Sequence, residues 1–183
     1  MKFYNSIGPN PRVVKMFMAE KGIDIPRVEV DLMGGENRQG SHLARNPSGQ
    51  TPTLELDDGS FLAEITAICE YLDEKHPSQP LIGTTAEERA VTRMSPATPS
   101  VSGCSQAAAD LKTLAQERIT WLDGLIASNA FVAGNRFTLA DILLYCTLDF
   151  GRTVGQPLNR DNANIAAWFD RVNARPSAEA SKK

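Results

Sequence analysis

The spacing of the hydrophobic residues changes once along this chain, close to residue 77, and this change restricts the fold more than any other feature. Before it, short runs with the two-residue period of a strand alternate with runs that have helical spacing. After the stretch 77–83 (PSQPLIG), which has the composition of a linker, every hydrophobic pattern is helical. The sequence therefore predicts an α/β domain over residues 1–76 and an all-α domain over residues 84–183.

The first 76 residues predict a strand, a helix, a strand, a hairpin and a helix, in that order. Strands are expected at residues 2–5, 28–32, 53–56 and 60–63. The last two flank Asp57-Asp58-Gly59, and an Asp-Gly turn between short apolar runs favours a hairpin. Asn10 as N-cap and Pro11 as the first helical residue predict the first helix, which Gly22 ends. An i, i+3, i+4, i+7 stripe that starts at Ile65 predicts the second helix.

Two capping boxes, Thr85–Glu88 and Thr138–Asp141, predict helix starts in the second domain. The helix that begins at Thr85 is expected to span about ten residues, because the prolines of the next segment interrupt it. That segment, residues 95–105 (SPATPSVSGCS), has the composition of a loop or a disordered region, so the helical domain is shortened there. Apolar residues at helical spacing predict two more helices, around residues 111–126 and 165–172.

Composition excludes several classes of function. The net charge is −3 and no basic stripe is present, which argues against a nucleic acid or an anionic membrane as partner. No apolar run approaches the roughly 20 residues of a membrane-spanning helix, and the first residues lack the apolar core of a secretory signal. Three scattered cysteines, and two histidines without ligand partners at zinc spacing, predict a reduced, cytoplasmic protein with no metal site.

Three stretches of this sequence resemble the glutathione S-transferase family. NPSGQTPTLELDDGSFLAEITAICEYLDEKHP resembles its N-terminal domain, and FVAGNRFTLADILLY and WFDRVNARPS resemble its helical C-terminal domain. The run GPNPR near the N-terminus is most similar to a bacterial branch of the superfamily. The resemblance covers residues 1–94 and about 106–178, with an apparent deletion after residue 94. It implies a thioredoxin-like α/β domain that binds glutathione, followed by an α-helical domain, usually in a homodimer.

The resemblance also implies a glutathione site within residues 50–66. Pro52 is similar to the family's cis-proline, which leaves the Thr51 backbone free to pair with the cysteinyl residue of glutathione like an added strand. Glu64 is expected to receive the γ-glutamyl ammonium, while amides at the helix start receive its carboxylate. Where the family commonly has serine after the acid, this chain has Ile65, and Thr66 is the next hydroxyl. The expected glutathione-binding residues are Gln50, Thr51, Pro52, Glu64, Ile65 and Thr66.

Each of these residues also has an ordinary structural interpretation. Pro52 fits the entrance of a strand, where no ladder donor is needed. Glu64 fits a helix start, where the dipole favours an acid. Gln50 is equally consistent with an ordinary polar residue of a loop.

The residue that activates the thiol is less well defined. Family members use a Tyr, Ser or Cys near the end of the first strand to donate a hydrogen bond to the thiolate. The usual position falls on Ile7 or Gly8 here, and neither side chain can donate. Ser6, with a one-residue shift, and Asn10, through its amide, are the catalytic candidates. Tyr4 is a third alternative, although it also fits the core.

Two functions from different classes follow from these observations. The first is an enzyme that conjugates reduced glutathione, as co-substrate, to small apolar electrophiles in detoxification. The second is a glutathione-binding but catalytically weak family member or interaction module, which the shortened helical region favours. A thiol–disulfide oxidoreductase is a third alternative, but the chain has no C-x-x-C motif. Reduced transferase activity is expected, because the shortened region normally walls the electrophile pocket and contributes to the dimer.

Overall fold

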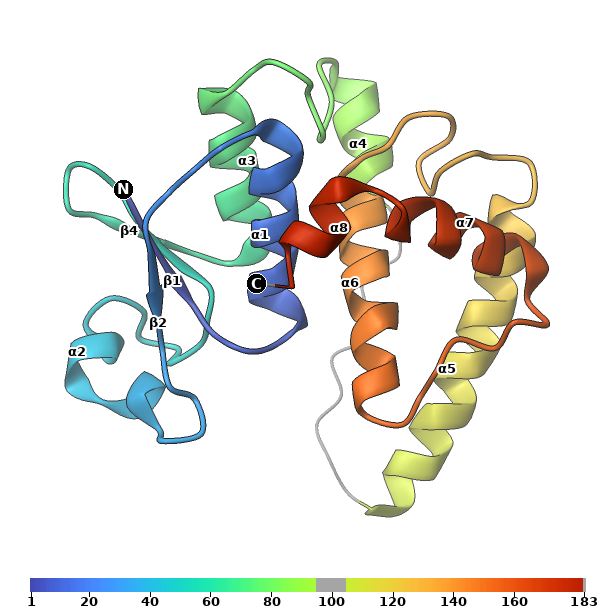
Figure 1. Cartoon of the computed structure of the whole chain (residues 1–183), viewed down its shortest axis with the longest axis horizontal. Coiled ribbons are helices and arrows are strands. Elements are labelled where there is room, and N and C mark those ends of the chain that lie inside the picture. Colours follow the sequence, from blue (N-terminus) through green and yellow to red (C-terminus); the bar gives the residue numbers. More distant parts are fainter. Residues whose placement is uncertain (95–104, 183) are drawn as a thin grey trace. The chain divides into compact units, whose positions relative to one another are not determined.

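The computed structural model describes residues 1–94 and 105–182, with backbone alone for residues 105–111 and 114 (Figure 1). The chain forms two compact units, Met1–Pro80 with Pro176–Lys183 and Leu81–Arg175. Residues 95–104 of the predicted loop lie outside the described residues. The α/β class of the first part and the helical class of the second are confirmed. The domain boundaries at residues 76 and 84 stay predictions, because compact units and domains need not coincide.

A four-stranded sheet forms the centre of the first unit. Its strands are β1 (Lys2–Asn5), β2 (Arg27–Glu29), β3 (Thr53–Glu55) and β4 (Phe61–Ala63), in the order β2-β1-β3-β4. β1 runs parallel to β2 and antiparallel to β3, which pairs with β4 in the predicted hairpin. Phe3 and Leu54, opposite each other in β1 and β3, are fully buried. β2 is shorter than predicted, although Val30 N–H still donates to the Asn5 carbonyl at 2.7 Å.

Helices cover both sides of this sheet (Figure 1). α1 (Pro9–Lys21) and α3 (Ile65–Lys75) pack side by side on one face, and the short α8 (Pro176–Ala180) packs on α1. η1 (Glu36–Arg38) and α2 (Gly40–Leu43) lie on the other side, between the second and third predicted strands. Gly22 ends α1 in the left-handed conformation, as predicted.

The start of α1 differs from the prediction. The N-cap is Gly8 and the helix begins at Pro9, so the Asn10 N-cap was wrong and Asn10 is the second helical residue. Pro9 explains the difference, because a proline with fixed φ suits the first helical position as well as Pro11 does. The Asn10 amide is therefore not used in capping.

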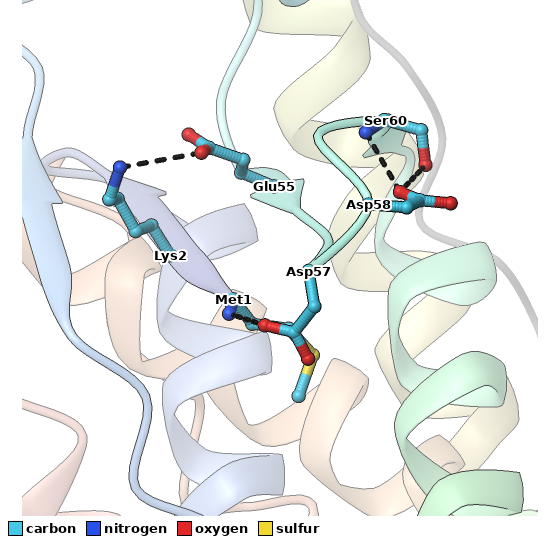
Figure 2. Close-up of polar contacts among 6 residues, drawn as sticks. All are labelled: Met1, Lys2, Glu55, Asp57, Asp58 and Ser60. Atoms are coloured by element: carbon cyan, nitrogen blue, oxygen red, sulfur yellow. Dashed lines mark hydrogen bonds and ion pairs between the residues drawn. The ribbon is translucent and has the colours of Figure 1, made fainter.

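Side chains fix the turn of the β3–β4 hairpin (Figure 2). Asp58 Oδ1 accepts hydrogen bonds from the backbone N–H and the hydroxyl of Ser60, at 2.9 and 2.6 Å, and these bonds lower the pKa of the Asp58 carboxyl. Next to the turn, Lys2 Nζ lies 3.3 Å from Glu55 Oε1, and the N-terminal ammonium pairs with Asp57. The two ion pairs join the start of β1 to β3 and to the turn, and the pairing of β3 with β4 confirms the predicted Asp-Gly hairpin.

All regular secondary structure among the described residues of the second unit is helical, apart from one isolated bridge. Its helices are α4 (Ala86–Met94), α5 (Ser105–Ile126), α6 (Leu139–Thr153) and α7 (Ala163–Asn173). α5 caps α7, because Asp123 Oδ1 accepts the Ile165 N–H at 2.8 Å. α4 starts directly after Thr85, as its capping box predicts, and the Thr85 hydroxyl accepts the Glu88 N–H at 3.1 Å. The predicted stop at the following prolines lies outside the described residues.

The predicted capping box of α6 is present and has a larger role than a cap. Asp141 Oδ2 accepts the backbone N–H of Thr138 at 2.9 Å and its hydroxyl at 3.2 Å. Oδ1 accepts the Val132 N–H at 2.9 Å and the Trp168 indole N–H at 2.8 Å. Asp141 therefore joins the start of α6 to α7 and to the preceding loop. Burial of this carboxyl nevertheless raises its pKa.

Candidate active site

A cleft in the first unit lies where the start of α1 meets the loop before β3. It has a volume of about 290 Å³. The lining residues are Ile7, Gly8, Pro9, Asn10, Pro11, Leu32, Asn37, Gly49, Gln50 and Thr51. Three predicted site residues, Asn10, Gln50 and Thr51, thus come together here. A larger hollow of about 580 Å³ lies along α5 in the second unit, but it contains none of the predicted residues.

Thr51 presents its backbone at this cleft. The Thr51–Pro52 peptide bond is cis, as the family resemblance implies. Regular pairing of β3 with β1 begins two residues later, at Thr53. Within the described part of the chain, no hydrogen bond occupies the N–H or the carbonyl of Thr51. One donor and one acceptor therefore remain for an extended peptide ligand.

Buried polar side chains hold the loop that carries Gln50 and Thr51. His42 Nε2 donates to the Gln50 carbonyl at 3.0 Å, and Asn46 Nδ2 donates to the same oxygen at 2.9 Å. Asn37 Nδ2 donates to the Gly49 carbonyl at 2.7 Å. These positioning residues are not among the predicted site residues. The turn-forming stretch Asn46-Pro-Ser-Gly was the available signal, because Asn side chains commonly bond to nearby backbone in turns.

Glu64 lies beside the cis-proline. β3 and β4 pair Thr53 with Ala63, so the next antiparallel step sets Pro52 opposite Glu64. Glu64 is the N-cap of α3, is exposed, and has φ 68 and ψ 129. No described residue makes a hydrogen bond or ion pair with its carboxylate. The acid therefore lies at a helix N-terminus with both oxygens available to a ligand.

The residues after Glu64 differ in exposure, and neither lines the cleft. Ile65 is half-buried, and the Thr66 side chain is exposed in the first turn of α3. Pro52 and Glu64 also lie outside the lining, although the hairpin register sets them next to Thr51. The binding roles predicted for these four residues stay predictions.

The three candidates for thiol activation have different surroundings. The Tyr4 hydroxyl donates to Glu55 Oε2 at 2.6 Å, and burial, followed by this bond, raises the pKa of Tyr4. Ser6 is 3% exposed and its hydroxyl contacts the Thr51 hydroxyl. Asn10 is exposed in the first turn of α1 and lines the cleft. The Tyr4 hydroxyl is thus bonded to β3, Asn10 lines the cleft, and the buried Ser6 contacts the lining residue Thr51. The catalytic roles of Ser6 and Asn10 stay predictions.

The described residues contain neither a metal-binding cluster nor a membrane-spanning helix. No group of three or more His, Cys, Asp and Glu side chains gathers there as a metal site would require. No helix in the described ranges is both long and apolar enough to cross a membrane.

A mixed four-stranded sheet with helices on both sides, a cis-proline before β3 and a following helical unit define a thioredoxin-like domain joined to an α-helical domain. Comparison with known families gives the same result. Residues 7–75 match the glutathione S-transferase N-terminal domain, and residues 91–176 match the glutathione S-transferase C-terminal domain. The chain belongs to the glutathione S-transferase family.

Relatives and solved structures extend the likeness over almost the whole chain. Glutathione S-transferase 2 of Saccharomyces cerevisiae is 29% identical, over 94% of this chain and 84% of the yeast protein. A glutathione S-transferase domain-containing protein from Marinobacter aquaeolei is 35% identical, with a TM-score of 0.87 over 97% of this chain and 99% of its own. A sphingomonad glutathione S-transferase, solved in complex with glutathione, is 27% identical, with a TM-score of 0.79 over 99% and 96% of the two chains.

Proposed function

We propose that this protein is a glutathione transferase that conjugates reduced glutathione to small apolar electrophiles. The observation that carries the proposal is the unpaired Thr51 backbone beside a cis-proline, with the exposed Glu64 across the hairpin. The two features lie next to each other and have complementary chemistry. One offers main-chain hydrogen bonds to an extended peptide, and the other offers a carboxylate to an ammonium.

Glutathione fits these groups in one orientation. Its cysteinyl backbone pairs with the N–H and the carbonyl of Thr51. Its γ-glutamyl ammonium binds Glu64, and the α-carboxylate of the same group binds the first amides of α3, where the helix dipole favours an anion. Ile65 supplies no hydroxyl, so the backbone amides and Thr66 are the remaining donors. Gln50 and Asn37 also line the cleft, and their amide side chains suit the glycyl end of the tripeptide.

The reaction requires a thiolate, because the thiolate and not the thiol is the nucleophile. A free thiol has a pKa of about 8.5, so only a few per cent is ionised at neutral pH. The site must therefore stabilise the anion, for which Ser6 and Asn10 are the predicted donors. The sulfur then attacks the electrophilic carbon: an S–C bond forms, the leaving group takes its bonding electrons, and the thiol proton passes to solvent.

Glutathione titration by calorimetry tests the binding half of the proposal. Glu64→Gln removes one charge and should weaken glutathione binding about 10- to 100-fold, because a hydrogen bond between charged groups contributes about 1.5–3 kcal/mol. Asp24→Asn is the matched control, since Asp24 is an exposed acid that does not line the cleft. Equal affinities for the wild type and the Glu64 variant would refute the assignment of Glu64.

A second candidate function is glutathione binding with weak catalysis. The Ser/Pro-rich sequence after residue 94 favours it, because its composition offers little apolar helix surface for an electrophile. Conjugation of a generic aromatic electrophile separates the two functions. A rate typical of full-length relatives supports the transferase, whereas tight glutathione binding with no measurable conjugation supports the alternative.

The setting of the enzyme is part of the same proposal. A homodimer in a reducing cytoplasm agrees with the family and with Cys69 and Cys146, which are buried and form no disulfide. Light scattering on the purified protein measures the mass directly. A monomer mass at micromolar concentration would contradict the proposed dimer. It would not contradict the proposed glutathione site.

A further inference from the structure

Two hydroxyl groups from distant parts of the sequence meet at the edge of the cleft. Ser6 Oγ contacts Thr51 Oγ1, although the two residues are 45 positions apart. Ser6 is 3% exposed, whereas Thr51 is half-buried and lines the cleft. A ligand in the cleft therefore contacts Thr51, whereas the buried Ser6 reaches the cleft only through its contact with Thr51.

Hydrogen-bond capacity determines what this pair can do. Each hydroxyl has one proton to donate and two lone pairs. The other contact of Ser6 Oγ is the Ile7 carbonyl at 3.5 Å, the limit of a hydrogen bond. When Ser6 donates to Thr51, the Thr51 proton can point into the cleft. An anion there selects this arrangement, because it accepts hydrogen bonds and cannot donate them.

Strand pairing places a glutathione thiol near this proton. Side chains of directly opposed residues in an extended pair lie on the same face, with Cβ atoms about 4.5–5.5 Å apart. A cysteinyl residue that pairs with the Thr51 backbone therefore carries its sulfur on the side that holds the Thr51 hydroxyl. Both groups are one bond beyond Cβ, so they can approach within hydrogen-bond distance.

We propose that the Thr51 hydroxyl is the catalytic donor that stabilises the glutathione thiolate, and that the buried Ser6 is the positioning residue that orients it. This inference rests on the proposed function and replaces Ser6 as the group that touches sulfur. Tyr4 is excluded by its bond to Glu55. Asn10 is the competing donor, because its exposed amide also lines the cleft.

The ultraviolet absorbance of the thiolate, titrated with pH on the glutathione complex, tests the inference. Thr51→Val keeps the shape and the backbone and removes the hydroxyl, so it should raise the pKa of the bound thiol by about one unit. Thr51→Ser should restore most of the wild-type value. Ser6→Ala should cause a smaller rise, and combining it with Thr51→Val should add nothing further. Ser60→Ala, in the hairpin turn, is the control for loss of a serine hydroxyl.

Binding of S-methylglutathione separates catalysis from binding, because this ligand carries no ionisable thiol. Thr51→Val should change its affinity less than about twofold, since the backbone contacts persist. An unchanged thiol pKa in Thr51→Val, or a full rise in Asn10→Ala, would overturn the inference and leave the glutathione site standing. Failure of the wild type to bind S-methylglutathione would refute the proposed function itself.

Discussion

Two acids stand at two helix starts in this protein, and they have opposite surroundings. Asp141, in the first turn of α6, is buried, and its two oxygens accept four hydrogen bonds. Glu64, the N-cap of α3, is exposed and has a left-handed φ of 68, and its carboxylate has no partner among the described residues. The helix dipole favours both acids equally, so the dipole alone does not distinguish them.

The two acids differ in the hydrogen bonds that their carboxylates accept. Asp141 joins three segments of the second unit, so the hydrogen bonds that its oxygens accept stabilise the fold. The Glu64 backbone carbonyl accepts the Ile68 N–H at 3.0 Å, but its carboxylate has no partner among the described residues. The positive φ of Glu64 costs roughly 1–3 kcal/mol, and no described contact of its side chain offsets that cost. The contrast gives Asp141 a structural role and supports the proposal that the Glu64 carboxylate binds a ligand.

Asp141→Ala should have the largest effect on stability. It leaves the buried N–H groups of Val132 and Trp168 without acceptors, and each unsatisfied donor costs about 1–3 kcal/mol. With the cap of α6 also lost, the free energy of unfolding should fall by about 3–5 kcal/mol. Urea unfolding, followed by tryptophan fluorescence, measures the loss.

Asp170→Ala is the matched control, because Asp170 is an exposed aspartate of α7 paired only at the surface with Arg160. Its loss should lower the free energy of unfolding by less than about 1 kcal/mol. Equal losses in the two variants would show that the buried hydrogen bonds of Asp141 contribute no more than a surface pair.

Local signals in the sequence account for most of the fold. The hairpin followed from an Asp-Gly turn, the end of α1 from Gly22, and the start of α6 from the box at Thr138, because each depends on neighbouring residues alone. The predicted start of α1 was wrong because the local signal is ambiguous there: Pro9 and Pro11 both suit the first helical position. η1 and α2 were missed because three- and four-residue helices are too short to show periodicity.

The candidate site was predictable only in part. The cis-proline and Glu64 came from the family resemblance, since neither composition nor spacing shows a cis bond or a left-handed φ. The contact between Ser6 and Thr51 joins residues 45 positions apart, and it depends on how β1 aligns with β3. Single-sequence patterns contain no information on such alignment. His42 was equally hidden, because its bond to the Gln50 carbonyl forms only after the loop has folded.

The pH dependence of stability should show the same contrast at smaller scale. Burial raises the pKa of Asp141 above its ordinary value of 3.8, so the folded state retains a proton that the unfolded state has already lost. The stability that the protonated Asp141 carboxyl contributes is therefore fully present below pH 3.8. It declines as the pH rises through the raised pKa of the folded state.

Subtracting the profile of Asp141→Asn isolates this contribution, because asparagine keeps the shape and does not titrate. Urea unfolding at a series of pH values should show the wild type losing its advantage over the variant as the pH rises. A wild-type advantage that instead grows with pH would mean that the four hydrogen bonds outweigh burial.

Glu64→Gly should have the smallest effect on stability and the clearest effect on function. Glycine adopts a positive φ without the Cβ penalty, which removes about 1 kcal/mol of strain. Its greater freedom in the unfolded chain offsets part of that gain, so stability should stay the same or rise by less than about 1 kcal/mol. Glutathione affinity should fall at least as far as in Glu64→Gln.

Thermal unfolding measures the stability of Glu64→Gly and Glu64→Ala, and calorimetry measures their glutathione affinity. Alanine should show no gain in stability, because it keeps the strain. If Glu64→Gly destabilised the protein as much as Asp141→Ala, both acids would be structural, and the exposed carboxylate of α3 would no longer indicate a ligand.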